Sequence, residues 1–118
     1  MQDLAKGKLF WLSYDLGLKG DYERLYYWLD LHKARECGGN VAALYYTKPL
    51  GQLLSDDDFA VEIKEELEKI VSFNPEDRVY LVFLSDNKIK GKFIIGRRKP
   101  APWAGFAPAE GEVIVDEE

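Results

Sequence analysis

The sequence predicts an α+β domain in which two amphipathic helices cover one face of a four- to five-stranded sheet, forming a two-layer sandwich. Three observations predict this class: almost continuous apolar runs typical of strands, two segments with a helical apolar period, and short connections between them. With 118 residues, of which 47% are hydrophobic, the chain is long enough for one such domain and its core.

The strands are predicted from their apolar runs. The first is expected over residues 8–16, because LFWLSYDLG (9–17) is almost unbroken apolar and has the composition of a strand buried on both faces. NVAALYY (40–46) predicts the second strand, and RVYLVFL (78–84) predicts another strand in the middle of the sheet. SDNK then predicts a turn, after which IKGKFIIG (89–96) returns as a hairpin partner.

Two helices are expected between these strands. The first begins at Gly20 or Asp21 and ends at the Gly38–Gly39 pair. Its apolar stripe consists of Tyr22, Leu25, Tyr26 and Leu29. The second helix is capped by Ser55 and ends at Asn74–Pro75. Its core stripe consists of Phe59, Ile63, Leu67, Ile70 and Val71.

The order of elements is nearest to a ferredoxin-like sandwich, which needs one more strand between the helices. PLGQLL (49–54) is the predicted source of that strand. Residues 1–99 would then form the domain. Residues 100–118, first proline-rich and then acidic, would form an irregular arm and tail.

Composition and motifs narrow the function classes. Cys37 is the single cysteine, so an internal disulfide is excluded and a reducing, cytoplasmic location is expected. No stretch approaches the ~20 apolar residues of a membrane span, so no membrane partner is expected. Glycine-rich phosphate loops are missing from the sequence, and His32 is the only histidine, which argues against a Ser-His-Asp triad.

Residues 88–99 form a basic ribbon with a local charge of +6, although the whole chain carries −5. Its basic residues are Lys88, Lys90, Lys92, Arg97, Arg98 and Lys99. One interpretation is a nucleic-acid contact, because phosphates are bound at short range whatever the net charge of the protein. The other is that these side chains protect an edge hairpin against aggregation.

A second apolar face is expected on the first helix. Tyr27, Trp28 and Leu31 fall outside the predicted stripe, and Trp103 lies in the arm. These four residues predict a surface for a protein partner. The alternative is that the C-terminal segment of the same chain covers the helix.

Asp15 stands where the first strand should leave the core. Its carboxylate is a candidate ligand for Mg²⁺ or Mn²⁺ and a candidate catalytic residue, since such a metal activates water at a phosphodiester. One carboxylate makes a poor site, so a homodimer would have to bring two copies together. The alternative is that Asp15 bonds backbone amides in a turn. Asp56, Asp57 and Asp58 are the ordinary acids of a helix start.

LSYDL at the end of the first strand, the helix directly after it, and DRVYLVFLSDNKIKGKFIIGRRKPAPWAG (77–105) resemble the CRISPR-associated Cas-two family and its virulence-associated protein D relatives. The resemblance implies a ferredoxin-fold homodimer in which a late strand crosses to the partner. It also implies either a metal-dependent nuclease acting through Asp15 or a non-catalytic scaffold. The segment LGLKG (16–20) departs from the polar, basic loop of many members, which weakens the nuclease interpretation.

The expected function is therefore a cytoplasmic homodimer that associates with nucleic acid in a defence or toxin-antitoxin setting. Whether it is also a metal-dependent endonuclease stays open at this point. The alternative is a non-catalytic protein-interaction or scaffold module.

Overall fold

The computed structural model describes residues 8–47 and 55–108. They form two helices and five strands, which follow one another in the order predicted apart from one additional short strand. The elements are β1 (Lys8–Asp15), α1 (Tyr22–Leu31), β2 (Arg35–Glu36), β3 (Val41–Tyr46), α2 (Asp56–Ile70), β4 (Arg78–Ser85) and β5 (Lys88–Ile95).

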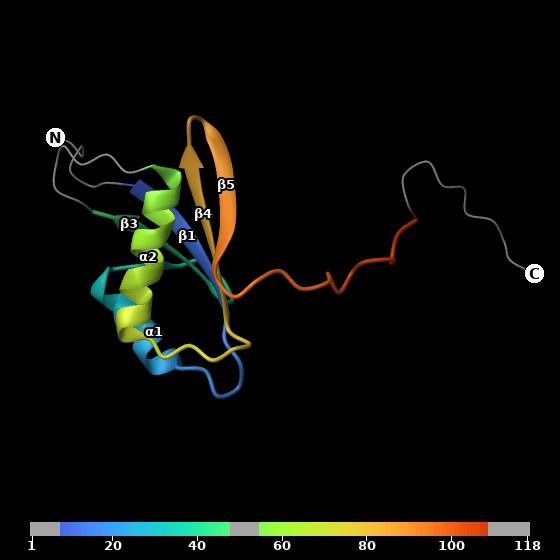
Figure 1. Cartoon of the computed structure of the whole chain (residues 1–118), viewed down its shortest axis with the longest axis horizontal. Coiled ribbons are helices and arrows are strands. Elements are labelled where there is room, and N and C mark those ends of the chain that lie inside the picture. The colour runs from blue at the N-terminus through green and yellow to red at the C-terminus, as the bar shows by residue number, and fades with distance from the viewer. Residues whose placement is uncertain (1–7, 48–54, 109–118) are drawn as a thin grey trace, which may run out of the picture.

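The strands form one antiparallel sheet in the order β2-β3-β1-β4-β5, and both helices lie on the same side of it (Figure 1). The α+β class and the one-sided helix layer are therefore as predicted. Residues 97–108 leave the end of β5 as an arm that runs away from both layers (Figure 1).

The core lies between the helices and one face of the sheet. β1 and β4 contribute every second side chain to it. β1 is therefore buried on one face and not on both as predicted. The reason is that the helices cover a single face, which leaves Leu9 and Trp11 on the open one. The largest fully buried side chains include Phe10, Leu12, Leu25, Trp28, Phe59, Ile63, Leu67 and Leu81.

The first helix is shorter than predicted. α1 ends at Leu31, and Lys33 then takes a left-handed backbone conformation with φ of 56°. The Gly38–Gly39 pair does not end the helix. With φ values of 95° and 52°, it makes the turn between β2 and β3. Residues 35–36 form a short strand between the helices. Residues 49–54, where the additional strand was predicted, lie outside the described residues.

The second helix begins as predicted. The Ser55 hydroxyl accepts a hydrogen bond from the Asp58 amide at 3.0 Å, which caps α2. Asp56 ties this end to the β4–β5 hairpin, accepting bonds from Lys90 Nζ at 2.7 Å and from Ser85 Oγ at 2.8 Å. The hairpin turn is also as predicted, with Asp86 and Asn87 both at positive φ.

These two hydrogen bonds, first from Lys90 and then from Ser85, hold the pKa of Asp56 below its ordinary value. Asp56 therefore stabilises the fold above the ordinary carboxyl pKa, and this contribution disappears as pH falls towards the lowered value. We expect Asp56→Asn to lower Tm at about pH 7 and to match wild type near pH 2. Thermal unfolding across this range checks the expectation, and a Tm difference independent of pH would contradict it.

Candidate nucleic-acid interface

The structure divides the predicted basic ribbon into two groups at opposite ends of β5. Lys90 and Lys92 pair in register with Phe83 and Leu81 of β4, so their side chains lie on the helix side of the sheet. Lys90 contacts Asp56 at 2.7 Å, and Lys92 Nζ lies 3.7 Å from an oxygen of Asp57. The first acids of α2 thus neutralise these lysines. Lys88 lies beside them at the hairpin turn and forms no ion pair with any described residue.

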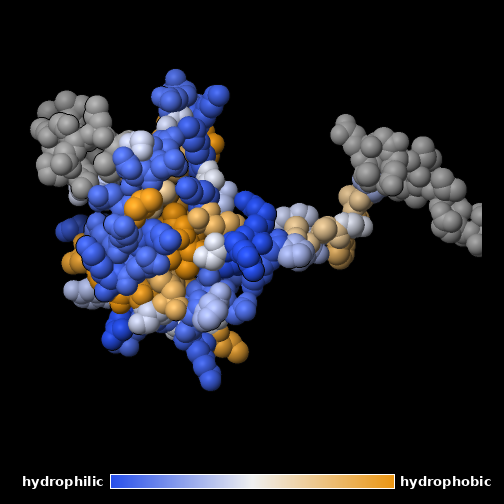
Figure 2. Space-filling view, viewed as in Figure 1, coloured by the Kyte–Doolittle hydropathy of each residue, from blue (hydrophilic) through white to orange (hydrophobic). Residues whose placement is uncertain are grey.

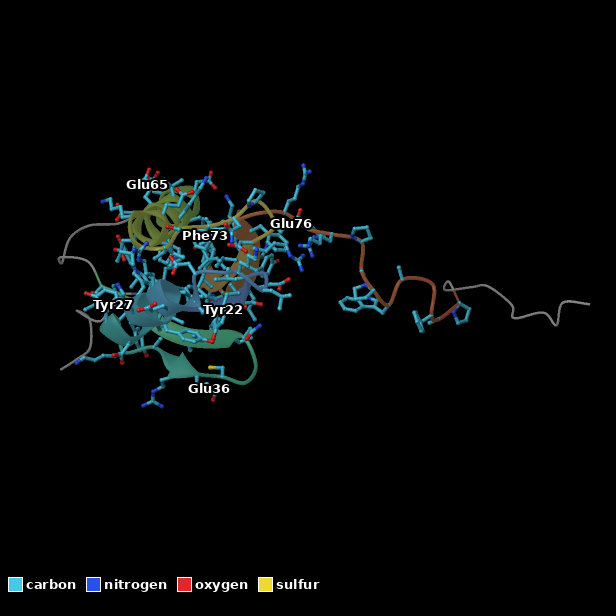
Figure 3. All side chains as sticks on the ribbon, turned by 90° about the horizontal axis from the view of Figure 1, so that it is seen from below. Tyr22, Tyr27, Glu36, Glu65, Phe73 and Glu76 are labelled. Carbon is cyan, nitrogen blue, oxygen red and sulfur yellow. The ribbon has the colours of Figure 1, made fainter. Side chains whose placement is uncertain are left out.

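The second group lies where the arm begins, a strongly hydrophilic part of the surface in Figure 2. Lys99 Nζ lies 3.6 Å from Glu76, which Figure 3 shows beside the start of the arm. Arg97 and Arg98 form no ion pair with any residue in the described ranges. Within the described residues, two guanidinium groups are therefore left without an acid, and such groups bind anions well.

Arg78, which the sequence did not single out, joins this group from the first position of β4. Its Nη2 donates to Asp15 Oδ2 at 2.8 Å, while its Nε is buried without a hydrogen-bond partner among the described residues. The guanidinium carbon also lies 5.7 Å from the centre of the Phe93 ring, within the range of a cation–π contact. Arg78 is thus held on the open face between an acid and an aromatic ring.

Asp77 is the anchor of this region, and no sequence pattern pointed to it. Its side chain is only 1% exposed and accepts hydrogen bonds from the amides of Gly17 at 3.0 Å and Asn74 at 2.7 Å. Gly96 adopts φ of +74° against the Asp77 backbone, where a β-carbon would collide with the carbonyl oxygen. The loop after β1, the turn before β4 and the start of the arm are thereby held together.

Two aromatic side chains complete the site. Tyr80 and Phe93 pair across β4 and β5, with their ring centres 4.7 Å apart in an edge-to-face arrangement. They line a shallow pocket of about 240 Å³ together with Ser13, Asp15, Arg78 and Arg98. A second hollow of about 580 Å³ adjoins it, because Arg78 and Arg98 line both. The arrangement offers guanidinium groups and aromatic rings side by side, the two chemistries used to bind nucleic acid.

Asp15 lies at the lip of this pocket, 58% exposed, with its carboxylate held by Arg78. Within residues 8–47 and 55–108, no three His, Cys, Asp or Glu side chains are grouped so as to hold a metal ion. The Arg78 guanidinium already pairs with one oxygen of this carboxylate, Oδ2, at 2.8 Å. Among the described residues Asp15 therefore has no second acid beside it, and the metal site expected from the sequence would need the Asp15 of a second copy.

The predicted protein-partner surface is not continuous. Tyr27, Leu31 and Trp103 are exposed, but Trp28 is 1% exposed and packs in the core, where its Nε1 donates to Glu66 at 3.2 Å. Trp28 cannot contact a partner here because α2 lies where that partner was expected. Leu31 instead lines a hollow of about 420 Å³ between the end of α1 and β3.

Comparison with models of known protein families, with curated proteins and with solved structures finds no match for this chain. Neither of the two described helices is long and apolar enough to cross a membrane.

The Asp77 anchor makes a first prediction about the site. Asp77→Ala leaves two backbone amides without their acceptor, so it should lower the free energy of unfolding by about 2–4 kcal/mol. Asp77→Asn retains one acceptor oxygen and should lower the free energy of unfolding by less. Denaturant unfolding of both variants checks this order, and equal stability of Asp77→Ala and wild type would show that the anchor contributes nothing.

Proposed function

We propose that this chain is a homodimer that associates with nucleic acid, in the defence or toxin-antitoxin setting implied by its resemblance to the Cas-two superfamily. The observation that carries the proposal is the pair Arg97 and Arg98, left without an acid among the described residues and joined by Arg78 at one pocket. Guanidinium groups bind phosphates through bidentate hydrogen bonds. Such short-range contacts can form on a protein that is acidic overall.

The strand arrangement supports the ferredoxin-like form of the fold. β1 and β2 both run antiparallel to β3, which lies between them, and α1 connects the outer two. β3 and β4 flank β1 in the same manner, and α2 connects them. These are two split βαβ units. β5 adds a strand beyond the four that such a sandwich requires.

The apolar end of the open face supports a dimer. Leu9 pairs in register with Tyr45, and Leu84 with Ile89, and all four side chains are exposed. Trp103 in the arm is 73% exposed. A second copy would cover the apolar rows and the edge of β5. Light scattering at micromolar concentration tests the assembly, and a monomer would contradict it.

The association with nucleic acid is tested by charge reversal. Arg97→Glu together with Arg98→Glu should weaken binding of a labelled oligonucleotide at least about tenfold at low salt. The slope of log affinity against log salt should also become shallower by about one for each phosphate that the variant no longer binds. Fluorescence anisotropy at several salt concentrations measures both quantities.

Lys64→Glu together with Lys69→Glu is the matched control, because it makes the same change in net charge on the exposed side of α2. If both double variants weaken binding equally, the effect is one of net charge, and the assignment to Arg97 and Arg98 fails. If wild type binds no oligonucleotide even at low salt, the proposed function itself is wrong.

Nuclease activity through Asp15 is the catalytic form of this proposal, and it requires a second Asp15 from the partner copy. With Arg78 as its partner, we expect Asp15→Asn to lower the free energy of unfolding by less than about 1 kcal/mol. We expect millimolar Mn²⁺ to leave the Tm of wild type unchanged, since a ligand raises Tm only by binding the native state. A Mn²⁺-dependent rise in wild type that Asp15→Asn abolishes would establish the metal site instead.

A protein-interaction module is the second candidate function. The observation that favours it is the hollow between α1 and β3, lined by Leu31, Ala43 and Tyr45, next to an edge of β3 that β2 pairs only at Ala42 and Ala43. Absence of oligonucleotide binding, combined with a dimer that resists salt, would support this alternative over the first.

A further inference from the structure

We propose that the open face of the sheet binds an unpaired base of single-stranded nucleic acid against the Tyr80 ring, with Arg98 on the adjoining phosphate. The inference rests on the proposed association with nucleic acid and names the form that is recognised. It is carried by the juxtaposition of Tyr80, Phe93 and the two guanidinium groups of Arg78 and Arg98 in one pocket.

The Tyr80 ring is held in a fixed position. It lies over Gly91 of the neighbouring strand, where a β-carbon would collide with the ring carbons and the hydroxyl. Phe93 packs against it with an interplanar angle of 65°. One side of the ring is therefore supported by the sheet, and Tyr80 also lines the pocket on the open face. A supported ring gives up little conformational entropy when a planar group stacks on it.

Guanidinium groups lie over the same rings, so a base that stacks on Tyr80 takes the place of Arg98, which moves to the phosphate. The guanidinium carbon of Arg98 is 5.6 Å from the centre of Tyr80 and 5.3 Å from the centre of Phe93. Arg78 lies 5.7 Å from Phe93. A nucleotide presents a flat base and a phosphate to its binding site. Stacking on an aromatic ring together with a guanidinium contact matches both parts, without selecting among the bases.

The pocket favours an unpaired base over a duplex. It is about 240 Å³ in volume and bounded by Ser13 and Asp15, so it admits a single planar group. Bases inside a duplex are stacked on their neighbours and cannot present a face to Tyr80. A duplex would therefore reach only the phosphate contacts of Arg97 and Arg98.

A second copy of the chain fits this end of the face less well. Asp15, Arg78 and Arg98 surround the pocket, and covering such charges with an apolar surface costs their hydration. The exposed apolar pairs, Leu9 with Tyr45 and Leu84 with Ile89, lie at the opposite end of the strands. The two surfaces are thus separate on the same face.

The experiment compares four labelled ligands at low salt: oligo-dT, oligo-U, an abasic strand of equal length, and a duplex. Wild type should bind one or both single strands more tightly than the abasic strand and the duplex. The oligo-dT and oligo-U arms distinguish DNA from RNA. Tyr80→Leu should weaken binding of the preferred single strand by about fivefold or more and leave binding of the abasic strand unchanged.

Gly91→Ala is the second variant, since it displaces the ring but retains the tyrosine and every charge. Like Tyr80→Leu, it should weaken binding of the preferred single strand. Tyr27→Leu removes an exposed tyrosine from α1, on the other layer, and should change nothing. Thermal unfolding of each variant confirms that it is folded before binding is compared.

The outcomes separate the two proposals. Equal binding of the abasic strand and the single strands by wild type, or equal weakening of all ligands in Tyr80→Leu, overturns the base site while leaving the phosphate contacts intact. If Tyr80→Leu turns a dimer into a monomer in light scattering, the ring lies between copies, and the inference is wrong. If none of the four ligands binds, the association with nucleic acid fails as well.

Discussion

The structure depends on one constraint: two helices of ten and fifteen residues cover only one face of a five-stranded sheet. Side chains alternate between the faces, so every strand that supplies the core must also supply an open surface. In β1 this places Phe10 and Leu12 beneath the helices, and Trp11 and Asp15 on the opposite side. The candidate interface is thus a consequence of the same alternation that builds the core.

The charged and aromatic side chains of the candidate interface lie at one end of that open surface because a buried carboxylate fixes the loops there. Asp77 accepts hydrogen bonds from two backbone amides, one 60 residues away in sequence and the other three residues away. An acceptor of this kind satisfies polar groups that would otherwise be buried unpaired. It also sets the start of β4, and so the position of Arg78 relative to Asp15. The pocket depends on Asp77, although Asp77 does not line it.

Charge pairing then decides which cations are available. Acids at the start of α2 lie opposite the lysines of β5, and Glu76 lies opposite Lys99. These pairs are exposed and add little to stability, but they reduce the local positive charge. Arg97 and Arg98 remain, next to aromatic rings. A chain of net charge −5 can therefore present a small basic site without being basic as a whole.

The sequence alone determined the α+β class, the Ser55 cap, the β4–β5 turn and the strands near 8–15 and 78–85, because local periodicity and turn chemistry carry that information. It misplaced the end of α1, since the left-handed Lys33 has no strong local signal. Tertiary structure alone decided that Trp28 is buried, that lysines of β5 meet acids of α2, and that Arg78, Tyr80 and Phe93 adjoin Arg98. Most of these contacts join residues far apart in sequence, and it is the packing of the helices and the pairing of the strands that bring them together.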